Sequence, residues 1–221
     1  MERALIFGGL SPQGFPLSEI LLEKGLQVVS LSTALNEDER QSEDERELFL
    51  GRNALFQIEK AAPEAFDYLF LTDMIRPSPK SNARLKEKWI KMFLPHPPAV
   101  PKSSVLLSSL EICGGNEGRR SESMPVHPRT ALGKAADEME SYFAGRLGKA
   151  GDVQTVIFRT DLGNFTDRRK GRRTAELMAE LAFADFPESR LEVIHFTDDP
   201  QGDPASNRKI KTILRGKIDW L

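Results

Sequence analysis

The sequence has little of what a disulfide-rich, metal-binding or membrane protein needs. Its one cysteine, Cys113, excludes an intramolecular disulfide framework and favours a reducing compartment. Three histidines and one cysteine leave no tetrahedral zinc set, so we expect no metal. The apolar runs are far shorter than the roughly 18 residues that span a bilayer, and the first residues lack the pattern of a secretory signal. We therefore expect a soluble, cytoplasmic protein with no membrane partner.

An excess of charge of one sign is also missing. The chain has 31 Lys and Arg against 33 Asp and Glu, which gives a net charge of −2. A general polyanion binder carries a clear excess of basic residues, so nucleic acid is not the expected partner. The 221 residues are enough for one α/β domain with a sizeable core, and we take residues 1–221 as a single domain.

Short apolar segments alternate with helical periodicity along the chain. Strands are expected at residues 4–7, 27–32, 67–72, 104–109, 153–159 and 191–196. Helices are expected at residues 17–24, 85–94, 131–143, 175–184 and 207–214, and a loop at 75–82. The acid-rich segment 36–47 is interpreted as a solvated loop that runs into a helix with the apolar stripe Leu48, Leu55 and Ile58. This alternation predicts an α/β fold with a Rossmann-type, doubly wound parallel sheet.

Residues 8–14, Gly-Gly-Leu-Ser-Pro-Gln-Gly, follow the first expected strand and open the first expected helix. This context, and the six-residue spacing from Gly8 to Gly14, are those of a phosphate loop, in which glycines let the backbone approach a pyrophosphate at a helix N-terminus. However, Ser11 stands where the pattern has its middle glycine, and Pro12 has no N–H to donate. A dinucleotide site and a purely structural turn both stay open; we favour the first.

The cofactor should also touch the carboxyl ends of neighbouring strands, because ligands of open parallel sheets bind there. The expected cofactor-binding residues are Gly8, Gly9, Ser11, Gln13, Gly14, Ser32 and Thr72. The second strand ends in hydroxyl side chains, and not in the acid that binds a ribose hydroxyl or the base that binds a 2′-phosphate. The expected cofactor is therefore NAD or NADP, with the type left open.

The segments that follow resemble the extended short-chain dehydrogenase/reductase family, which includes nucleotide-sugar epimerases and dehydratases. The family ends a strand with a serine pair and has a glycine five residues later, as at Ser108, Ser109 and Gly114. Its motif Pro-x-Ser-x-Tyr-Gly-x-Ser-Lys-x-x-x-Glu aligns with residues 128–140 and matches at Pro128, Gly133 and Glu140. Arg159 with Gly163, and residues 194–200, resemble later family segments. The resemblance covers nearly the whole chain and implies a Rossmann fold that binds NAD(P).

The family's acid–base pair is missing from the aligned positions. Its tyrosine and lysine are replaced by Leu132 and Ala136, neither of which can move a proton. A frame shifted by two residues restores the spacing with Thr130 and Lys134, but a threonine hydroxyl is a far weaker acid than a phenol. His127 is another candidate acid, and Ser109 is a remnant that orients substrate.

A cluster of basic residues, 168–173, lies where the family brings substrate to the site. Arginine binds phosphate bidentately, so the candidate anion- or substrate-binding residues are Arg159, Arg168, Arg169 and Arg172. A solvated loop is the alternative interpretation. Residues 164–221 are expected to form a small, reduced substrate-side portion, because family enzymes carry longer C-terminal segments. The resemblance also implies a homodimer through helices 83–94 and 131–143.

Three functions follow from this combination. The first choice is an NAD(P)-binding sensor or pseudoenzyme that resembles the epimerases and reductases but lacks their catalytic pair. The second is an atypical oxidoreductase or epimerase that uses substituted residues. The third is a scaffold that no longer binds the cofactor. Whether the chain is an enzyme stays open at this point.

Overall fold

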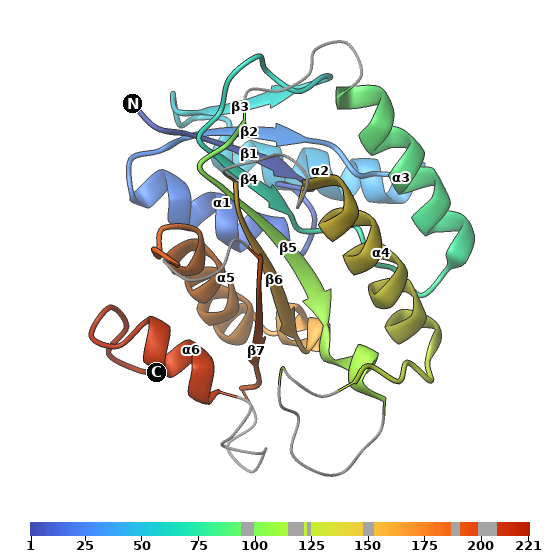
Figure 1. Cartoon of the computed structure of the whole chain (residues 1–221). Coiled ribbons are helices and arrows are strands. Elements are labelled where there is room, and N and C mark those ends of the chain that lie inside the picture. Colours follow the sequence, from blue (N-terminus) through green and yellow to red (C-terminus); the bar gives the residue numbers. More distant parts are fainter. Residues whose placement is uncertain (94–99, 115–121, 123–124, 148–152, 187–190, 199–206) are drawn as a thin grey trace.

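The computed structural model describes residues 1–93, 100–114, 122, 125–147, 153–186, 191–198 and 207–221. Seven parallel strands form one sheet in the order β3-β2-β1-β4-β5-β6-β7 (Figure 1). They are β1 (Arg3–Phe7), β2 (Gln27–Leu31), β3 (Phe56–Glu59), β4 (Tyr68–Leu71), β5 (Ser103–Ser109), β6 (Gln154–Thr160) and β7 (Leu191–Phe196). The strand order reverses between β1 and β4, which is the switch point where ligands bind in such sheets. The predicted doubly wound, Rossmann-type sheet is confirmed.

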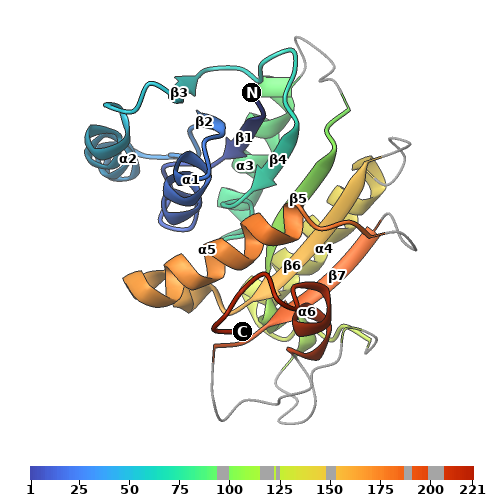
Figure 2. The same cartoon turned by 90° about the vertical axis from the view of Figure 1, so that its left-hand side faces the viewer.

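Helices cover both faces of the sheet. Helices α1 (Gly14–Glu23), α5 (Arg168–Ala182) and α6 (Arg208–Ile213) bury apolar side chains against one face, and α3 (Pro79–Phe93) and α4 (Ala131–Leu147) cover the other. Helix α2 (Glu37–Leu50) lies beside β2 and β3 at one end of the sheet (Figure 2). The 3-10 helices η1 (Leu110–Cys113) and η2 (Leu162–Thr166) follow β5 and β6. No helix in the described ranges is long and apolar enough to cross a membrane.

Three local predictions are wrong. The helical stripe expected through Leu55 and Ile58 is not one helix, because α2 ends at Leu50 and residues 56–59 pair with β2 as the edge strand β3. The loop expected at 75–82 ends early, because Pro79 begins α3, at a position where its missing N–H costs nothing. The basic segment 168–173 is not a loop but the start of α5, capped by Asp167, which accepts the Lys170 N–H at 2.9 Å.

Candidate functional site

The loop between β1 and α1 folds tightly against the carboxyl ends of β2 and β4. The Gly8 N–H donates to the Leu31 carbonyl at 2.8 Å, and Thr72 Oγ1 donates to the Phe7 and Gly8 carbonyls at 3.0 and 3.1 Å. Gly8 has φ of +91°, and a Cβ on Gly14 would overlap the Gly8 carbonyl oxygen, so both positions require glycine. The loop therefore has the close backbone approach that a pyrophosphate cradle needs.

Ser11 occupies the helix end that a phosphate would use. Its Oγ accepts the Gly14 N–H at 3.0 Å, and its carbonyl accepts the Phe15 N–H at 2.9 Å. Pro12 contributes no N–H, while Gln13 Oε1 is buried without a hydrogen-bond partner in the described part of the chain. The loop therefore has the shape of a phosphate-binding loop, but one of its possible donors, the Gly14 N–H, is hydrogen-bonded to the loop's own Ser11 side chain.

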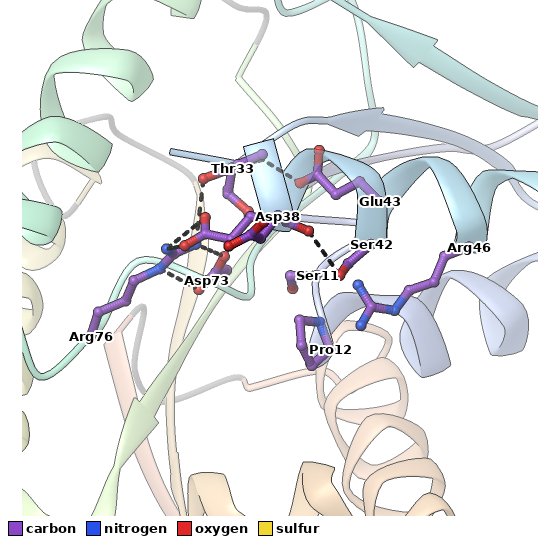
Figure 3. A pocket seen from close by; sticks show the side chains of 11 residues that line it. Ser11, Pro12, Thr33, Asp38, Ser42, Glu43, Arg46, Asp73 and Arg76 are labelled. Carbon is purple, nitrogen blue, oxygen red and sulfur yellow. Dashed lines mark hydrogen bonds and ion pairs between the residues drawn. The ribbon is translucent and has the colours of Figure 1, made fainter. Parts of the chain in front are cut away.

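A pocket of about 200 Å³ opens beside this loop, between β2, α2 and the end of β4 (Figure 3). Its charged lining consists of four carboxylates and two arginines: Asp38, Glu39, Glu43, Asp73, Arg46 and Arg76. Pockets for whole organic ligands are usually about 300–1,000 Å³, so this one is smaller than a site for a whole dinucleotide. It lies close to the switch point between β1 and β4, where ligands of open parallel sheets bind.

Arg76 joins α2 to the end of β4 across this pocket (Figure 3). Its Nη2 lies 2.6 Å from Asp73 Oδ2, and its Nη1 lies 2.9 Å from both carboxylate oxygens of Glu39. Thr33 Oγ1 donates to the same Asp73 oxygen at 2.6 Å. Burial raises the pKa of Glu39, but the Leu35 N–H and Arg76 outweigh it and hold that pKa below its ordinary value. The charge of Arg76 is therefore already matched by two carboxylates.

Glu43 of α2 places a buried carboxylate beside the end of β2. It is 6% exposed, accepts a hydrogen bond from Ser32 Oγ at 2.5 Å and accepts the Thr33 N–H at 3.0 Å. Ser32 is thus hydrogen-bonded to a neighbouring helix, with its hydroxyl proton committed to Glu43. Lys88 lies near this position, and burial lowers its pKa.

On α4, the two positions that the sequence resemblance aligns with the family's acid–base pair face the protein interior. Leu132 packs partly buried against the core, and Ala136 is fully buried. Lys134, the lysine of the shifted frame, is exposed. In a helix the residues at i and i+4 share a face, so Leu132, Ala136 and Glu140 form one stripe and Lys134 lies off it.

The other catalytic candidates are engaged in local structure. Thr130 accepts the Gly133 N–H at 2.9 Å at the start of α4 and donates to Glu111 Oε2 at 2.5 Å. Ser109 is 1% exposed, and its Oγ accepts the Glu111 N–H at 3.2 Å. His127 is exposed and anchors its loop through its N–H, which donates to the Ile112 carbonyl at 3.1 Å. The structure gathers these residues around η1 without a hydrogen-bonded acid–base pair among them.

Glu140 and Arg159 form an ion pair below this edge. Arg159 is 6% exposed, and its Nε and Nη2 lie 2.9 and 2.6 Å from the Glu140 carboxylate. Ser108 Oγ donates to the same carboxylate at 2.5 Å, and Arg159 Nη1 lies 3.2 Å from His195 Nε2. Burial lowers the pKa of Arg159, but Glu140 outweighs it and raises that pKa. The guanidinium proposed for substrate is thus matched by an internal carboxylate.

The basic residues at the start of α5 are only partly free. Arg172 lies 2.6 Å from Glu23, and Arg173 lies 3.6 Å from Asp198. Arg168 and Arg169 are exposed and have no ion pair with another described residue. An anion at this helix start would meet these two first.

Sequence reasoning missed Glu39, Glu43, Asp73 and Arg76. The four-residue spacing of Glu39 and Glu43 puts both on one face of α2 and was a usable signal, whereas nothing local links Arg76 to a residue 37 positions away. No group of three or more His, Cys, Asp or Glu side chains in the described segments is arranged to hold a metal ion.

No protein-family model and no curated protein matches the sequence. Solved structures do share the fold. UDP-glucose 4-epimerase from Bifidobacterium longum, in complex with NAD⁺ and UDP, matches with a TM-score of 0.64 over 88% of this chain and 77% of that one, at 13% identity. The UDP-Glc/GlcNAc 4-epimerase from Campylobacter jejuni matches with a TM-score of 0.61 over 89% and 78%, at 12% identity.

The chain spans little more than half the length of some other matches. UDP-glucuronic acid 4-epimerase from Bacillus cereus, in complex with NAD, has a TM-score of 0.54 and 14% identity over 72% of this chain, which spans 56% of that protein's length. Identities this low demonstrate the fold alone. The chain therefore has the Rossmann-like fold of NAD-binding nucleotide-sugar epimerases.

Proposed function

We propose that this protein binds a dinucleotide at the loop 8–14 and does not use the acid–base chemistry of the enzymes it resembles. One observation carries the proposal: the loop closes so tightly at the switch point that Gly14 has no room for a Cβ. A purely structural turn does not require this approach, whereas a pyrophosphate at the N-terminus of α1 does. NAD in the structural neighbours supports the same choice of ligand.

The charge of the adjacent pocket favours NAD over NADP. Four carboxylates line it against two arginines, and Arg76 is already paired with Asp73 and Glu39. Such a pocket repels the extra charge of a 2′-phosphate, while carboxylates accept hydrogen bonds from ribose hydroxyls. Glu43 is buried at the end of β2 and would serve this role in place of the acid that usually ends the strand.

The described residues at the β5 edge include no hydrogen-bonded acid–base pair, which favours a binding protein over an enzyme. Leu132 and Ala136 remove both members of the family's pair, and Thr130 is occupied as the cap of α4. Proton transfer by a positioned side chain is worth about 10²–10⁴-fold in rate, so a site without one is slow. The bound dinucleotide would then act as a signal, with residues 164–221 forming the remaining substrate-side portion.

A scaffold that has lost the cofactor is the rival function, and one observation favours it. Ser11 already satisfies the Gly14 N–H, and Arg76 spans the pocket between Glu39 and Asp73. A dinucleotide would have to displace part of this arrangement.

Fluorescence titration of the full chain with NADH and NADPH tests the binding proposal. We expect NADH to bind at least about tenfold more tightly, a difference of about 1.4 kcal/mol. Asp38→Arg, at an exposed position of the pocket, should shift the preference toward NADPH, and Glu45→Arg on the same helix is the matched control. Binding of neither nucleotide would leave the scaffold function.

Turnover assays test the second half of the proposal. We expect alcohols, carbonyls and nucleotide-sugars to react little faster than background in the presence of NAD. The double variant Leu132→Tyr, Ala136→Lys restores the tyrosine and lysine of the family's acid–base pair and tests the same point by a gain of turnover. Wild-type turnover above roughly 1 s⁻¹, within the usual enzyme range, would show that another residue moves the proton and that the atypical-enzyme interpretation is right.

A further inference from the structure

The C-terminal half of α2 carries an exposed apolar pair among acids. Leu48 and Phe49 are both 77% exposed, although Phe49 also makes an edge contact with Phe15, at 6.5 Å between ring centroids. One helical turn earlier lie Asp44 and Glu45, on the same face. We call Asp44, Glu45, Glu47, Leu48 and Phe49 the α2 knob. Its three carboxylates form no ion pair with any other described residue.

A hollow of about 620 Å³ lies on α6 and the turn that follows it. The buried Leu214 and Ile218 and the partly buried Leu221 line this α6 hollow together with three cations that form no ion pair with another described residue: Arg208, Lys211 and Arg215. Residues 208–217 contain five basic residues and no acidic one, in a chain whose charges otherwise nearly balance. A solvated helix face in such a chain would be expected to mix both signs.

The hollow rests on a fixed turn. Trp220 Nε1 donates to Glu176 Oε2 at 2.9 Å, and the guanidinium of Arg173 stacks 4.9 Å from the Trp220 ring. Ile210 and Leu214 are buried against the sheet. The backbone that carries the basic side chains is therefore packed against the sheet and α5, while these side chains themselves are exposed to solvent.

The α2 knob is acidic and exposed, and the α6 hollow is basic and recessed, so the two are complementary. However, they lie at opposite ends of the sheet. Helix α2 sits beside β3, the first strand in the sheet order, and α6 follows β7, the last one (Figures 1 and 2). One chain cannot fill its own hollow. An apolar pair ringed by three carboxylates on one copy meets an apolar floor ringed by three cations on another.

We propose that the α6 hollow receives the α2 knob of a second copy of this chain, so that copies associate head to tail. The two surfaces differ, so the contact is heterologous and repeats from copy to copy. The apolar pair supplies the buried centre, and the charges steer the encounter and set the register. The proposal is independent of the dinucleotide, since neither surface includes loop 8–14.

Sedimentation velocity of the full chain over a range of concentrations and salt tests the association. We expect species larger than a monomer at low salt and fewer of them at 1 M salt, where the screening length falls from about 10 Å at 0.1 M to about 3 Å. A knob variant (Leu48→Ser, Phe49→Ser) and a hollow variant (Lys211→Glu, Arg215→Glu) should each associate at least about tenfold more weakly. The control Lys80→Glu, Arg129→Glu matches the hollow variant's charge change on exposed residues elsewhere and should behave as wild type.

Mixing the two variants gives the sharper readout. The hollow variant keeps an intact knob and the knob variant keeps an intact hollow, so a mixture should form one-to-one dimers and nothing larger. A two-fold dimer through α3 and α4 would instead survive in each variant alone and would overturn the proposal. A wild-type chain that stays monomeric at low salt would overturn it too. If such a monomeric wild type bound labelled duplex DNA and the hollow variant did not, the hollow would be assigned to nucleic acid instead.

Discussion

Gly14 is the residue on which dinucleotide binding depends most directly. A side chain at this position would overlap the Gly8 carbonyl and press on Thr72 Oγ1 at 2.7 Å. We expect Gly14→Val to abolish NADH binding in a titration followed by fluorescence. Gly145→Val, in a helix where a Cβ meets nothing within 4 Å, is the control for a valine in place of a glycine. Equal affinity in a folded Gly14→Val protein would remove the loop from the site.

Replacement of Ser11 should have the opposite effect and raise the affinity for NADH. Its hydroxyl holds the Gly14 N–H, and Ser11→Gly releases that donor for a phosphate. Hydrogen bonds to charged groups are worth about 1.5–3 kcal/mol, so we expect NADH to bind about tenfold more tightly, after allowance for the more mobile glycine. Isothermal titration calorimetry measures the change, and unchanged affinity would mean that this N–H does not meet the ligand.

Glu140 is the residue whose loss should cost the most stability. Glu140→Gln leaves the buried Arg159 guanidinium without its counter-charge, at a cost of about 3–5 kcal/mol. Urea unfolding should show this loss, whereas Glu138→Gln, at a side chain that is 67% exposed, should change little. The double variant Glu140→Leu, Arg159→Met should recover most of the stability, and a failure to recover would show that the charges do more than pair.

At the scale of the element, variants at Thr130 can distinguish a structural role at the start of α4 from a catalytic role. It accepts the Gly133 N–H at the start of α4, so Thr130→Ala should cost about 1 kcal/mol of stability and Thr130→Ser should restore it. Thermal unfolding checks the cap, and any turnover measured in parallel should stay unchanged. A variant of normal stability and lost turnover would return Thr130 to the catalytic candidates.

Helix α2 is tied to β4 by a pH-dependent contact. The pKa of Glu39 is held below its ordinary value of 4.5, so the stability it contributes is present above that value and is lost as the pH falls through the lowered pKa. For a partly exposed pair we expect Glu39→Gln to cost about 0.5 kcal/mol at pH 7 and nothing in strong acid. Urea unfolding of wild type and variant at several pH values measures the difference. Glu45→Gln should show no such trend.

For the whole molecule, sequence reasoning succeeded where a pattern is local. Buried runs such as Ala4–Phe7 and the glycines around them are sufficient to predict a parallel sheet. Strand β3 escaped because it is a four-residue edge strand in which only Phe56 is buried, so it shows no buried run. The Arg76 contacts to Glu39 and Asp73 were not predicted from the sequence, because they depend on where β2 and β4 end in space. The glycine loop was predictable, and the charge of the pocket beside it was not.

The strand order also has a consequence for how the chain can be assembled during its synthesis. The first four strands, β1 to β4, occupy one contiguous half of the sheet. Each later strand then joins the edge left by the strand made just before it, in the sequence β5, β6, β7. A chain leaving the ribosome can therefore extend its sheet in one direction without reopening any earlier pairing. On this growing side of the sheet, the exposed edge from β4 to β6 lasts only until the next strand emerges, whereas β3 remains the edge on the other side and β7 the last edge on this one.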